Sequence, residues 1–227
     1  MDALTRELIV DAAIEILDSE GESGLTFRAL AARLETGHGA LQWHVATKNE
    51  LLKAAVKVVV DRAVGDPDPG DQPREAIHAV ALGIFDAIEA HPWLGRQLAH
   101  PPWRGTMLEI FERIGRQVQT MGIPAAAQFT GTSALLIHII GAGGQEATNS
   151  QSSAAHGDRQ HFLDLEAQRW AGLSPQEYAF TRAMAGPLRA HDDRTEFLAG
   201  IDLILAGISS LRAPGGSRPH RSVDVPR

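Results

Sequence analysis

The chain has 227 residues, 44% of them hydrophobic and 22% charged, so it can build a substantial core as one large or two small domains. It has no cysteine, which excludes disulfides and thiolate metal sites, and its net charge of −7 excludes a generally basic nucleic-acid-binding surface. Its N-terminus has no uninterrupted signal-peptide core and its longest apolar run, residues 134–144, is shorter than the roughly 20 residues of a membrane helix, so we expect a cytoplasmic protein without a membrane span.

Four helices are predicted in the first 64 residues. Apolar residues at helical spacing predict helices over about 3–20 and 26–34, with Thr26 as a suitable N-cap of the second. After a break at 35–37, residues 38–44 predict a short third helix. Thr47 and Glu50 have the S/T-x-x-E form of a capping box, which predicts a fourth helix over 47–64.

The stretch LQWHVATKNELLK, residues 41–53, places Trp43 and His44 just before the fourth helix and Lys48 in its first turn. The helix dipole disfavours a cation at that position by a few tenths of a kcal/mol. Backbone N–H groups at a helix start and a lysine together form a phosphate site, so an external anion would explain Lys48. A solvated surface lysine is the alternative interpretation.

Residues 65–73, GDPDPGDQP, show no periodic pattern, and we interpret them as a linker between a domain over 1–64 and a second domain over 74–212. Helical patterns continue over about 74–91, 103–121, 125–147, 159–171, 175–190 and 194–212, and no strand pattern appears. The polar stretch 148–158 predicts a loop, and 213–227 a disordered tail whose arginines are solvated. The predicted fold class is all-α.

Two helices joined by a three-residue turn form the layout of a helix-turn-helix, whose second element enters the major groove of DNA. A helix over 38–44 can offer His38, Gly39, Ala40 and Gln42 to the bases. Gln42 has an amide that can read adenine bidentately, and Ala40 can meet a thymine methyl group. The ring N–H groups of Trp43 and His44 suit phosphate oxygens.

Residues 6–60 resemble the N-terminal domain of TetR-family transcriptional regulators. The resemblance rests on residues that stand in register, which are Leu25-Thr26, Arg28, Leu30-Ala31, Leu41, Trp43-His44-Val45, Lys48 and Leu51-Leu52. It implies that Arg28, Trp43, His44 and Lys48 hold the DNA backbone or the groove edge. The predicted DNA-binding set is Thr26, Arg28, His38, Gly39, Ala40, Gln42, Trp43, His44 and Lys48.

Two residues depart from the family pattern. Glu35 stands in the turn where the family usually has glycine, and a glutamate at positive φ costs on the order of 1 kcal/mol, so the turn could be reshaped. Gln42 stands where the family commonly has an aromatic residue, so the operator cannot be inferred from relatives. Residues 1–62 also carry a net charge of −3, which requires any DNA contact to be focused on a patch.

The last helix carries bulky and small residues in adjacent rows, which favours close packing against another helix. The resemblance implies that this helix joins a four-helix dimer interface, and packing within the same chain is the alternative. The predicted dimerisation residues are Phe197, Gly200, Ile201, Ile204, Gly207, Ile208 and Leu211. A dimer would supply two DNA-reading heads for a near-palindromic operator.

The second domain contains aromatic and histidine residues that suit an apolar cavity with a few polar groups. The family resemblance places His138, Glu146 and His100 at positions that line a ligand pocket, with Trp103 in place of a threonine. The predicted ligand-binding residues are Phe85, His100, Trp103, Phe111, His138 and Glu146. Each of the histidines, taken alone, is more often a packed or surface residue than a ligand.

Together these patterns predict a TetR-like homodimeric repressor that a small-molecule inducer releases from a double-stranded DNA operator, with no cofactor and no metal. One alternative is a helical dimer without sequence-specific DNA binding, which the acidic N-terminal domain and Glu35 favour. Another is a metal-dependent enzyme that uses His138 and Glu146. The chain has no HExxH, GxSxG, Walker-type loop or GxGxxG, so the prediction is that it is not an enzyme.

Overall fold

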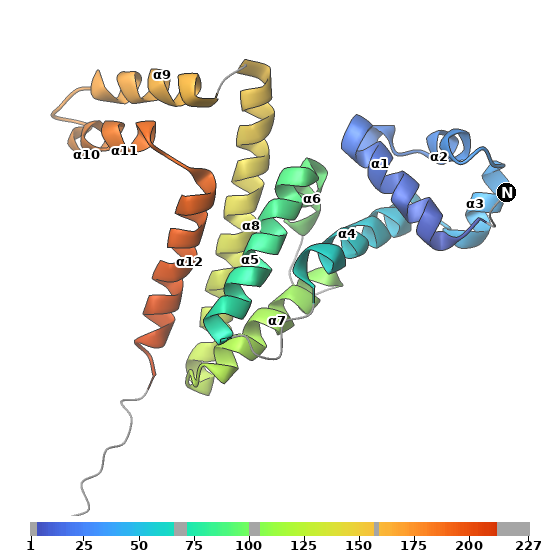
Figure 1. The fold of residues 1–227 in the computed structure, drawn as a ribbon, viewed down its shortest axis with the longest axis horizontal. Coiled ribbons are helices and arrows are strands. Elements are labelled where there is room, and N and C mark those ends of the chain that lie inside the picture. The colour runs from blue at the N-terminus through green and yellow to red at the C-terminus, as the bar shows by residue number, and fades with distance from the viewer. Residues whose placement is uncertain (1–3, 66–71, 100–104, 157–158, 213–227) are drawn as a thin grey trace, which may run out of the picture.

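The computed structural model describes the backbone of residues 4–65, 72–99, 105–156 and 159–212, and the side chains of these residues except 146–156. Within those ranges the chain forms twelve α-helices and no strand, which confirms the predicted all-α class. Figure 1 shows three parts. We call them the head (α1–α4), the body (α5–α8 with α12) and the arm (α9–α11), which projects from the end of the body.

The head consists of α1 (Arg6–Gly24), α2 (Phe27–Arg33), α3 (His38–His44) and α4 (Lys48–Val64), close to the predicted ranges. Its core is aliphatic, with Ile16, Leu30, Leu41 and Leu51 each at most 1% exposed. The predicted end of the first helix coincides with an interruption at Gly21, whose φ of 67° is accessible to glycine at little cost. The last turn of α1 therefore leaves the axis of the preceding turns.

The body consists of α5 (Pro73–Ala90), α6 (Pro92–Leu98), α7 (Thr106–Thr120), α8 (Ala125–His156) and α12 (Asp193–Ser209). Both α5 and α7 pack against α8, and α12 covers α8 from another side. The head joins this bundle where α4 crosses α5. A Cβ atom added at Gly83 of α5 would overlap the main-chain oxygen of Ala63 in α4, so the two helices touch through their backbones.

The arm consists of α9 (Arg159–Ala171), α10 (Ala179–Ala183) and α11 (Ala185–Arg189). One helix was predicted over 175–190, and that prediction was wrong, because the segment divides into two short helices at Met184. The arm leaves large apolar side chains in solvent, with Phe180 76% exposed and Leu165 51% exposed. It contacts the rest of the chain mainly through its neighbours in sequence (Figure 1).

Two further predictions of secondary structure were wrong. The polar stretch 148–158 was predicted as a loop, but α8 continues as a helix to His156. The segment after Pro92 was assigned to no helix, but it forms α6, where Pro92 occupies the first turn and needs no N–H donor. The predicted linker and tail fall largely on residues 66–71 and 213–227, which lie outside the described residues.

In the part of the chain that the structure describes, one helix meets the length and composition of a membrane span. Residues 125–145 of α8 have a mean hydropathy of 1.3, and 28% of that segment is buried inside the chain. Its buried side chains, such as Leu135 and Ile139, face α5, α7 and α12 in the body. Its outer side remains apolar as well, with Ile137 71% exposed.

The predicted dimerisation residues of α12 divide between two faces of the helix. Phe197, Ile201 and Ile208 are at most 5% exposed, because they pack into the core of their own chain, so their assignment to a dimer contact was wrong. Gly200 faces the ring of His138, with which an added Cβ would collide. The other predicted residues, which are half-buried or exposed, are Ile204 and Gly207 of α12 and Leu211, two residues after the end of the helix.

Candidate nucleic-acid interface

The short helix α3 is held to the head by one side chain per turn and presents the others to solvent. Leu41 is fully buried and Val45, which follows the helix, is 1% exposed. The side chains around Leu41 are all exposed, and Trp43 is 91% exposed. A tryptophan in this position covers no apolar surface of its own chain, so it is available to an external partner. The exposed residues of α3 are His38, Gly39, Ala40, Gln42, Trp43 and His44.

The turn between α2 and α3 has the geometry of a left-handed helix cap. Glu35 has a φ of 48°, and among the described residues it is the only non-glycine with positive φ. The N–H of Thr36 donates to the Ala31 oxygen at 3.0 Å and that of Glu35 to the Ala32 oxygen at 3.4 Å, which satisfies carbonyls at the end of α2. The turn is therefore not reshaped by Glu35, and the glutamate occupies the conformation that favours glycine.

The remaining predicted contact residues flank α3. Thr26 caps α2, since its hydroxyl oxygen accepts from the Ala29 N–H at 3.1 Å, and this leaves the hydroxyl proton free to donate outward. Arg28 is exposed on α2, beside the cap. Lys48 begins α4, where the Thr47 hydroxyl oxygen accepts from the Glu50 N–H at 3.1 Å and the Glu50 carboxylate accepts from the Ala46 N–H, also at 3.1 Å. The Glu50 bond reaches the residue before the N-cap rather than Thr47 itself, so the predicted capping box forms only in its Thr47 half, and the two bonds together fix the start of the helix that carries Lys48.

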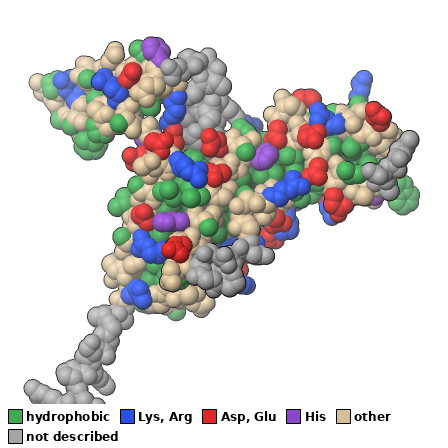
Figure 2. Space-filling view, in the orientation of Figure 1, with side chains coloured by type: hydrophobic (Ala, Val, Ile, Leu, Met, Phe, Trp, Pro, Cys, Tyr) green, Lys and Arg blue, Asp and Glu red, His purple; other side chains and the backbone are tan. Residues whose placement is uncertain are grey.

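Most acidic side chains of the head are paired away from α3. Residues 36–49 contain no aspartate or glutamate. Ion pairs join Glu15 to Arg33, Asp11 to Arg62 and Glu50 to Arg6. Figure 2 shows basic and acidic side chains interspersed over the head and the body, with no large basic face in this view. The exposed cations Arg28 and Lys48 lie near the starts of α2 and α4, on either side of α3 in the chain. Lys53, which the sequence reasoning did not include, is also exposed, but it lies further along α4 and lines a groove against α1.

The structure brings together only some of the predicted ligand-binding residues. Phe85 is 3% exposed and stacks on Phe197, with ring centroids 4.7 Å apart, and His138 also stacks on Phe197, with ring centroids 5.6 Å apart. Phe111 pairs instead with Phe129 at 5.9 Å. His100 and Trp103 lie outside the described residues, as does the side chain of Glu146.

His138 has the contacts of a packed histidine. Its Nε2 lies 3.1 Å from the carbonyl oxygen of Phe197. A carbonyl oxygen can only accept, so this nitrogen carries the proton and offers no lone pair to a metal. Among the described residues no group of three histidine, aspartate or glutamate side chains has the arrangement of a metal site. The enzyme alternative based on His138 therefore has no support from the geometry around that ring.

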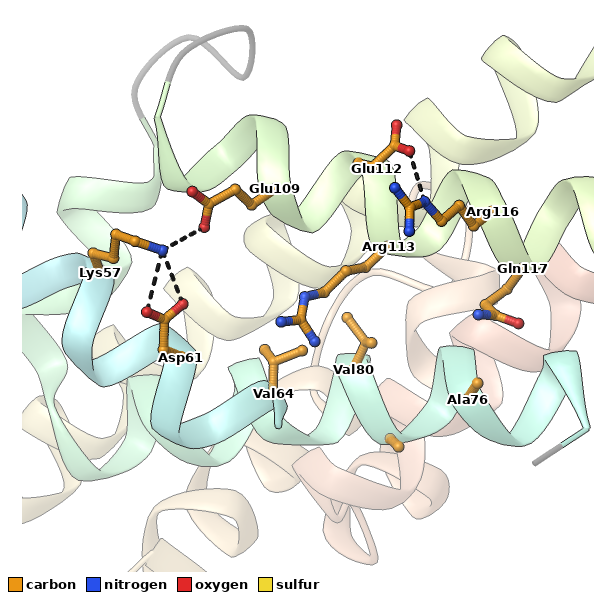
Figure 3. A pocket seen from close by; sticks show the side chains of 11 residues that line it. Lys57, Asp61, Val64, Ala76, Val80, Glu109, Glu112, Arg113, Arg116 and Gln117 are labelled. Atoms are coloured by element: carbon orange, nitrogen blue, oxygen red, sulfur yellow. Dashed lines mark hydrogen bonds and ion pairs between the residues drawn. The ribbon is translucent and has the colours of Figure 1, made fainter. Parts of the chain in front are cut away.

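A cavity of about 400 Å³ lies where the last turns of α4 meet α5 and α7 (Figure 3). Its apolar floor includes Val64 and Val80, and Arg113 reaches across it to donate to the main-chain oxygen of Gly65. At one end Lys57 of α4 bonds Glu109 of α7 at 2.8 Å and Asp61 at 3.1 Å. The hydrogen bond to Glu109 is the larger cause, and with the bond to Asp61 it raises the pKa of Lys57 and keeps the ammonium charged. The cavity thus touches the head and the body at once.

The comparisons with known proteins agree with this arrangement. Residues 9–55 match the family described as "Bacterial regulatory proteins, tetR family", and residues 66–212 match "Tetracyclin repressor-like, C-terminal domain". A curated relative, an HTH-type transcriptional regulator of Saccharopolyspora erythraea, is 27% identical over 215 residues, which cover 91% of this chain and 85% of that protein.

Two solved structures from Streptomyces coelicolor are also similar. The transcriptional regulator SCO7222, a TetR, is 53% identical with a TM-score of 0.84, over 93% of this chain and 100% of that chain. The TetR family protein ActR in complex with actinorhodin is 25% identical with a TM-score of 0.76, over 96% of this chain and 100% of that chain. Both similarities extend over the head and the body.

Proposed function

The chain belongs to the TetR family of DNA-binding transcriptional regulators, and from that premise we propose that it is a homodimeric repressor which a small molecule releases from a near-palindromic operator. The observation that carries the proposal is the exposed face of α3, where Gln42 and Trp43 stand free of their own chain beside Arg28 and Lys48. Because its target is chromosomal DNA, we expect the protein in the cytoplasm.

The DNA contacts divide by their chemistry. Gln42 has an amide that pairs bidentately with adenine, so we assign it to base reading, together with His38, Gly39 and Ala40. The ring N–H groups of Trp43 and His44, and the charges of Arg28 and Lys48, suit phosphate oxygens, and the Thr26 hydroxyl can donate to one. Base contacts set the sequence preference, and phosphate contacts set the register and the salt dependence.

The apolar outer face of α8 and α12 supports the dimer. The contacts of His138 with Gly200 and of Gly131 with Ile208 set an antiparallel register that brings Ile137 level with Leu203. These two side chains are 71% and 75% exposed. Exposed apolar side chains on two packed helices favour burial against another surface, and Gly207, one turn after Leu203 on α12, is exposed on the same side. Leu211, just after the helix, is exposed as well. A second copy placed there would form a four-helix contact and pair two heads for two half-sites.

We propose that the body binds the inducer. ActR was solved with actinorhodin, and we take from it that a body of this fold can hold a small organic molecule. Of the predicted ligand-binding residues, Phe85 and His138 both stack on Phe197, and we assign them to this site. The cavity between α4, α5 and α7 is a second place for a ligand, because a molecule bound there would contact both the head and the body. A ligand releases the DNA only if it binds more tightly to the head orientation that does not fit the operator than to the one that does.

The test is selection of genomic fragments by the purified protein, followed by titration of the recovered sequence. We expect one near-palindrome to be enriched and to be bound with a strong dependence on salt. The neighbouring genes would then suggest candidate inducers, each to be tested for release of the fragment. Failure to enrich any sequence, from a folded protein, would instead favour the helical dimer without sequence-specific DNA binding.

A further inference from the structure

Two acidic residues near the end of α1 bind the body helix α6. The Asp18 carboxylate accepts from the indole Nε1–H of Trp93 at 2.7 Å, and the same oxygen lies 2.7 Å from Nδ1 of His91. One turn further on, the Glu22 carboxylate accepts from the side-chain amide of Gln97 at 2.8 Å. We call these five residues the α1–α6 clasp. It joins the head to the body at a place separate from the chain connection through α4.

The clasp is partly shielded from water, which distinguishes it from the other ion pairs of α1. Trp93 is 7% exposed, so its indole N–H needs a partner, and Asp18 supplies it. The side chains of Asp18 and His91 are 34% and 25% exposed, whereas those of the surface pair Asp11 and Arg62 are 47% and 62% exposed. Hydrogen bonds to a carboxylate are stronger than neutral ones, and partial burial protects them from screening.

The clasp also touches the DNA-contacting side of the head. The interruption at Gly21 turns the end of α1, and the main-chain oxygen of Glu22 accepts from Nζ of Lys48 at 2.5 Å. Glu22 therefore binds α6 with its side chain and Lys48 with its backbone. A shift of α6 relative to the head would therefore pull on Glu22, whose main-chain oxygen binds Lys48.

We propose that Asp18 is a positioning residue, which fixes the orientation of the head on α6 and so sets the spacing of the two α3 helices in the dimer. This inference rests on the DNA-binding function and adds a residue that itself does not contact DNA. An operator requires two heads at one spacing, about 34–36 Å, whereas nonspecific DNA does not. A head held by the clasp already has its orientation relative to the body before it meets the operator. A head without the clasp must lose orientational freedom on binding, which lowers the affinity.

The test compares Asp18→Ala with Asp11→Ala. Both remove one carboxylate from α1, so they change the charge of the head equally, but Asp11 pairs with Arg62 inside the head. We expect Asp18→Ala to weaken binding of the selected operator about tenfold relative to Asp11→Ala, with equal binding of a shuffled duplex of the same length. Trp93→Phe keeps an aromatic ring and removes the N–H donor, and should repeat the effect. Equal operator affinities in variants that remain folded by circular dichroism would overturn the proposal.

A second measurement does not depend on DNA. Because the chain has no cysteine, spin labels can be attached at Ala32→Cys in the head and Gln119→Cys in the body. Labelled chains are diluted with unlabelled protein, so that each dimer contains one labelled chain. We expect a narrow distance distribution in the parent and in Asp11→Ala, and a broader one in Asp18→Ala and Trp93→Phe. Equally narrow distance distributions in all four proteins would refute the positioning role, even if no operator had been recovered. If the distributions broaden in Asp18→Ala and Trp93→Phe but no operator has been recovered, the positioning role stands and the proposed DNA-binding function is the part that fails.

Discussion

The ammonium of Lys48 lies 2.5 Å from the main-chain oxygen of Glu22, so the first residue of α4 is bonded to the last turn of α1. An ammonium has three N–H donors, and this bond occupies one of them. The other two remain available to a phosphate at the start of α4, where free backbone N–H groups also point outward. The lysine that the helix dipole disfavours is therefore compensated within the chain and is held in place before DNA binds.

We predict that Lys48→Ala and Gln42→Ala weaken DNA binding in different ways. Lys48→Ala should weaken binding to all sequences similarly and reduce the slope of affinity against salt by about one ion, because a phosphate contact is lost. Gln42→Ala should change the sequence preference, at a cost of about 1–3 kcal/mol on the preferred operator, with the salt slope unchanged. Titrations of the operator and its single-base variants at two salt concentrations measure both effects. Equal losses on every sequence from both variants would contradict this division of roles.

The turn residue Glu35 gives a prediction about stability. Glu35→Gly should raise the free energy of unfolding by about 1 kcal/mol, because glycine adopts the positive φ without the clash of a Cβ atom. Glu35→Ala is the matched control, since it removes the charge and keeps the Cβ. We expect it to give no such gain, while both variants bind nonspecific DNA more tightly than the parent because a negative charge near DNA is removed. Urea unfolding checks the first effect, and an alanine variant as stable as the glycine variant would count against strain.

The exposed face of α12 gives a prediction about assembly. Leu203→Glu should produce a monomer in sedimentation velocity, because it places a charge where we expect another copy to bury apolar surface. Leu108→Glu on α7, where the leucine is 49% exposed, makes the same exchange at a distance from that face and should leave the dimer intact. Gly200→Asp is expected to destabilise the fold itself, because the new side chain would occupy the position of the His138 ring. A dimer that survives Leu203→Glu would remove α12 from the interface.

The N-cap of α12 gives a prediction about acid. Hydrogen bonds from Thr195 lower the pKa of Asp192 below its ordinary value of 3.8. The stabilisation that Asp192 supplies is therefore complete above pH 3.8 and is lost as the pH falls through the lowered value. Asp192→Asn can still cap the helix but does not titrate, so its unfolding free energy should fall less in this range. Urea titrations at pH 7, 4 and 3 measure the difference, with Glu177→Gln as an exposed control; parallel losses in all three proteins would contradict the assignment.

Local chemistry explains why the head could be predicted from the sequence. Thr26 and Thr47 mark helix starts by caps that the structure contains, and Leu41 separates the buried side of α3 from its exposed side. Glu35 was recognised as a residue in a glycine position, and the structure places it at positive φ. Each of these signals lies within a few residues of its effect, so no knowledge of distant packing was needed.

The body was less predictable because its helices are defined by long-range packing. No periodic apolar pattern marks residues 148–156, yet α8 continues through them. The apolar residues of α12 gave no sign of which face would meet α8, so Phe197 and Ile201 were assigned to a partner although they belong to the core. The contacts of Asp18 with His91 and Trp93 span more than 70 residues and have no local signature.

The backbone contact between Gly83 and Ala63 determines how the head can move. With no side chain between them, α4 cannot come closer to α5 at this crossing, and it can turn there more easily than it can slide. The crossing is therefore a pivot point near one end of α4, a 17-residue helix whose other end carries Lys48. At 1.5 Å per residue, a rotation of α4 by about 5° about this pivot displaces the Lys48 end by about 2 Å. Side-chain adjustments too small to alter the packing of the body are thus enlarged to the scale of a hydrogen bond at the DNA.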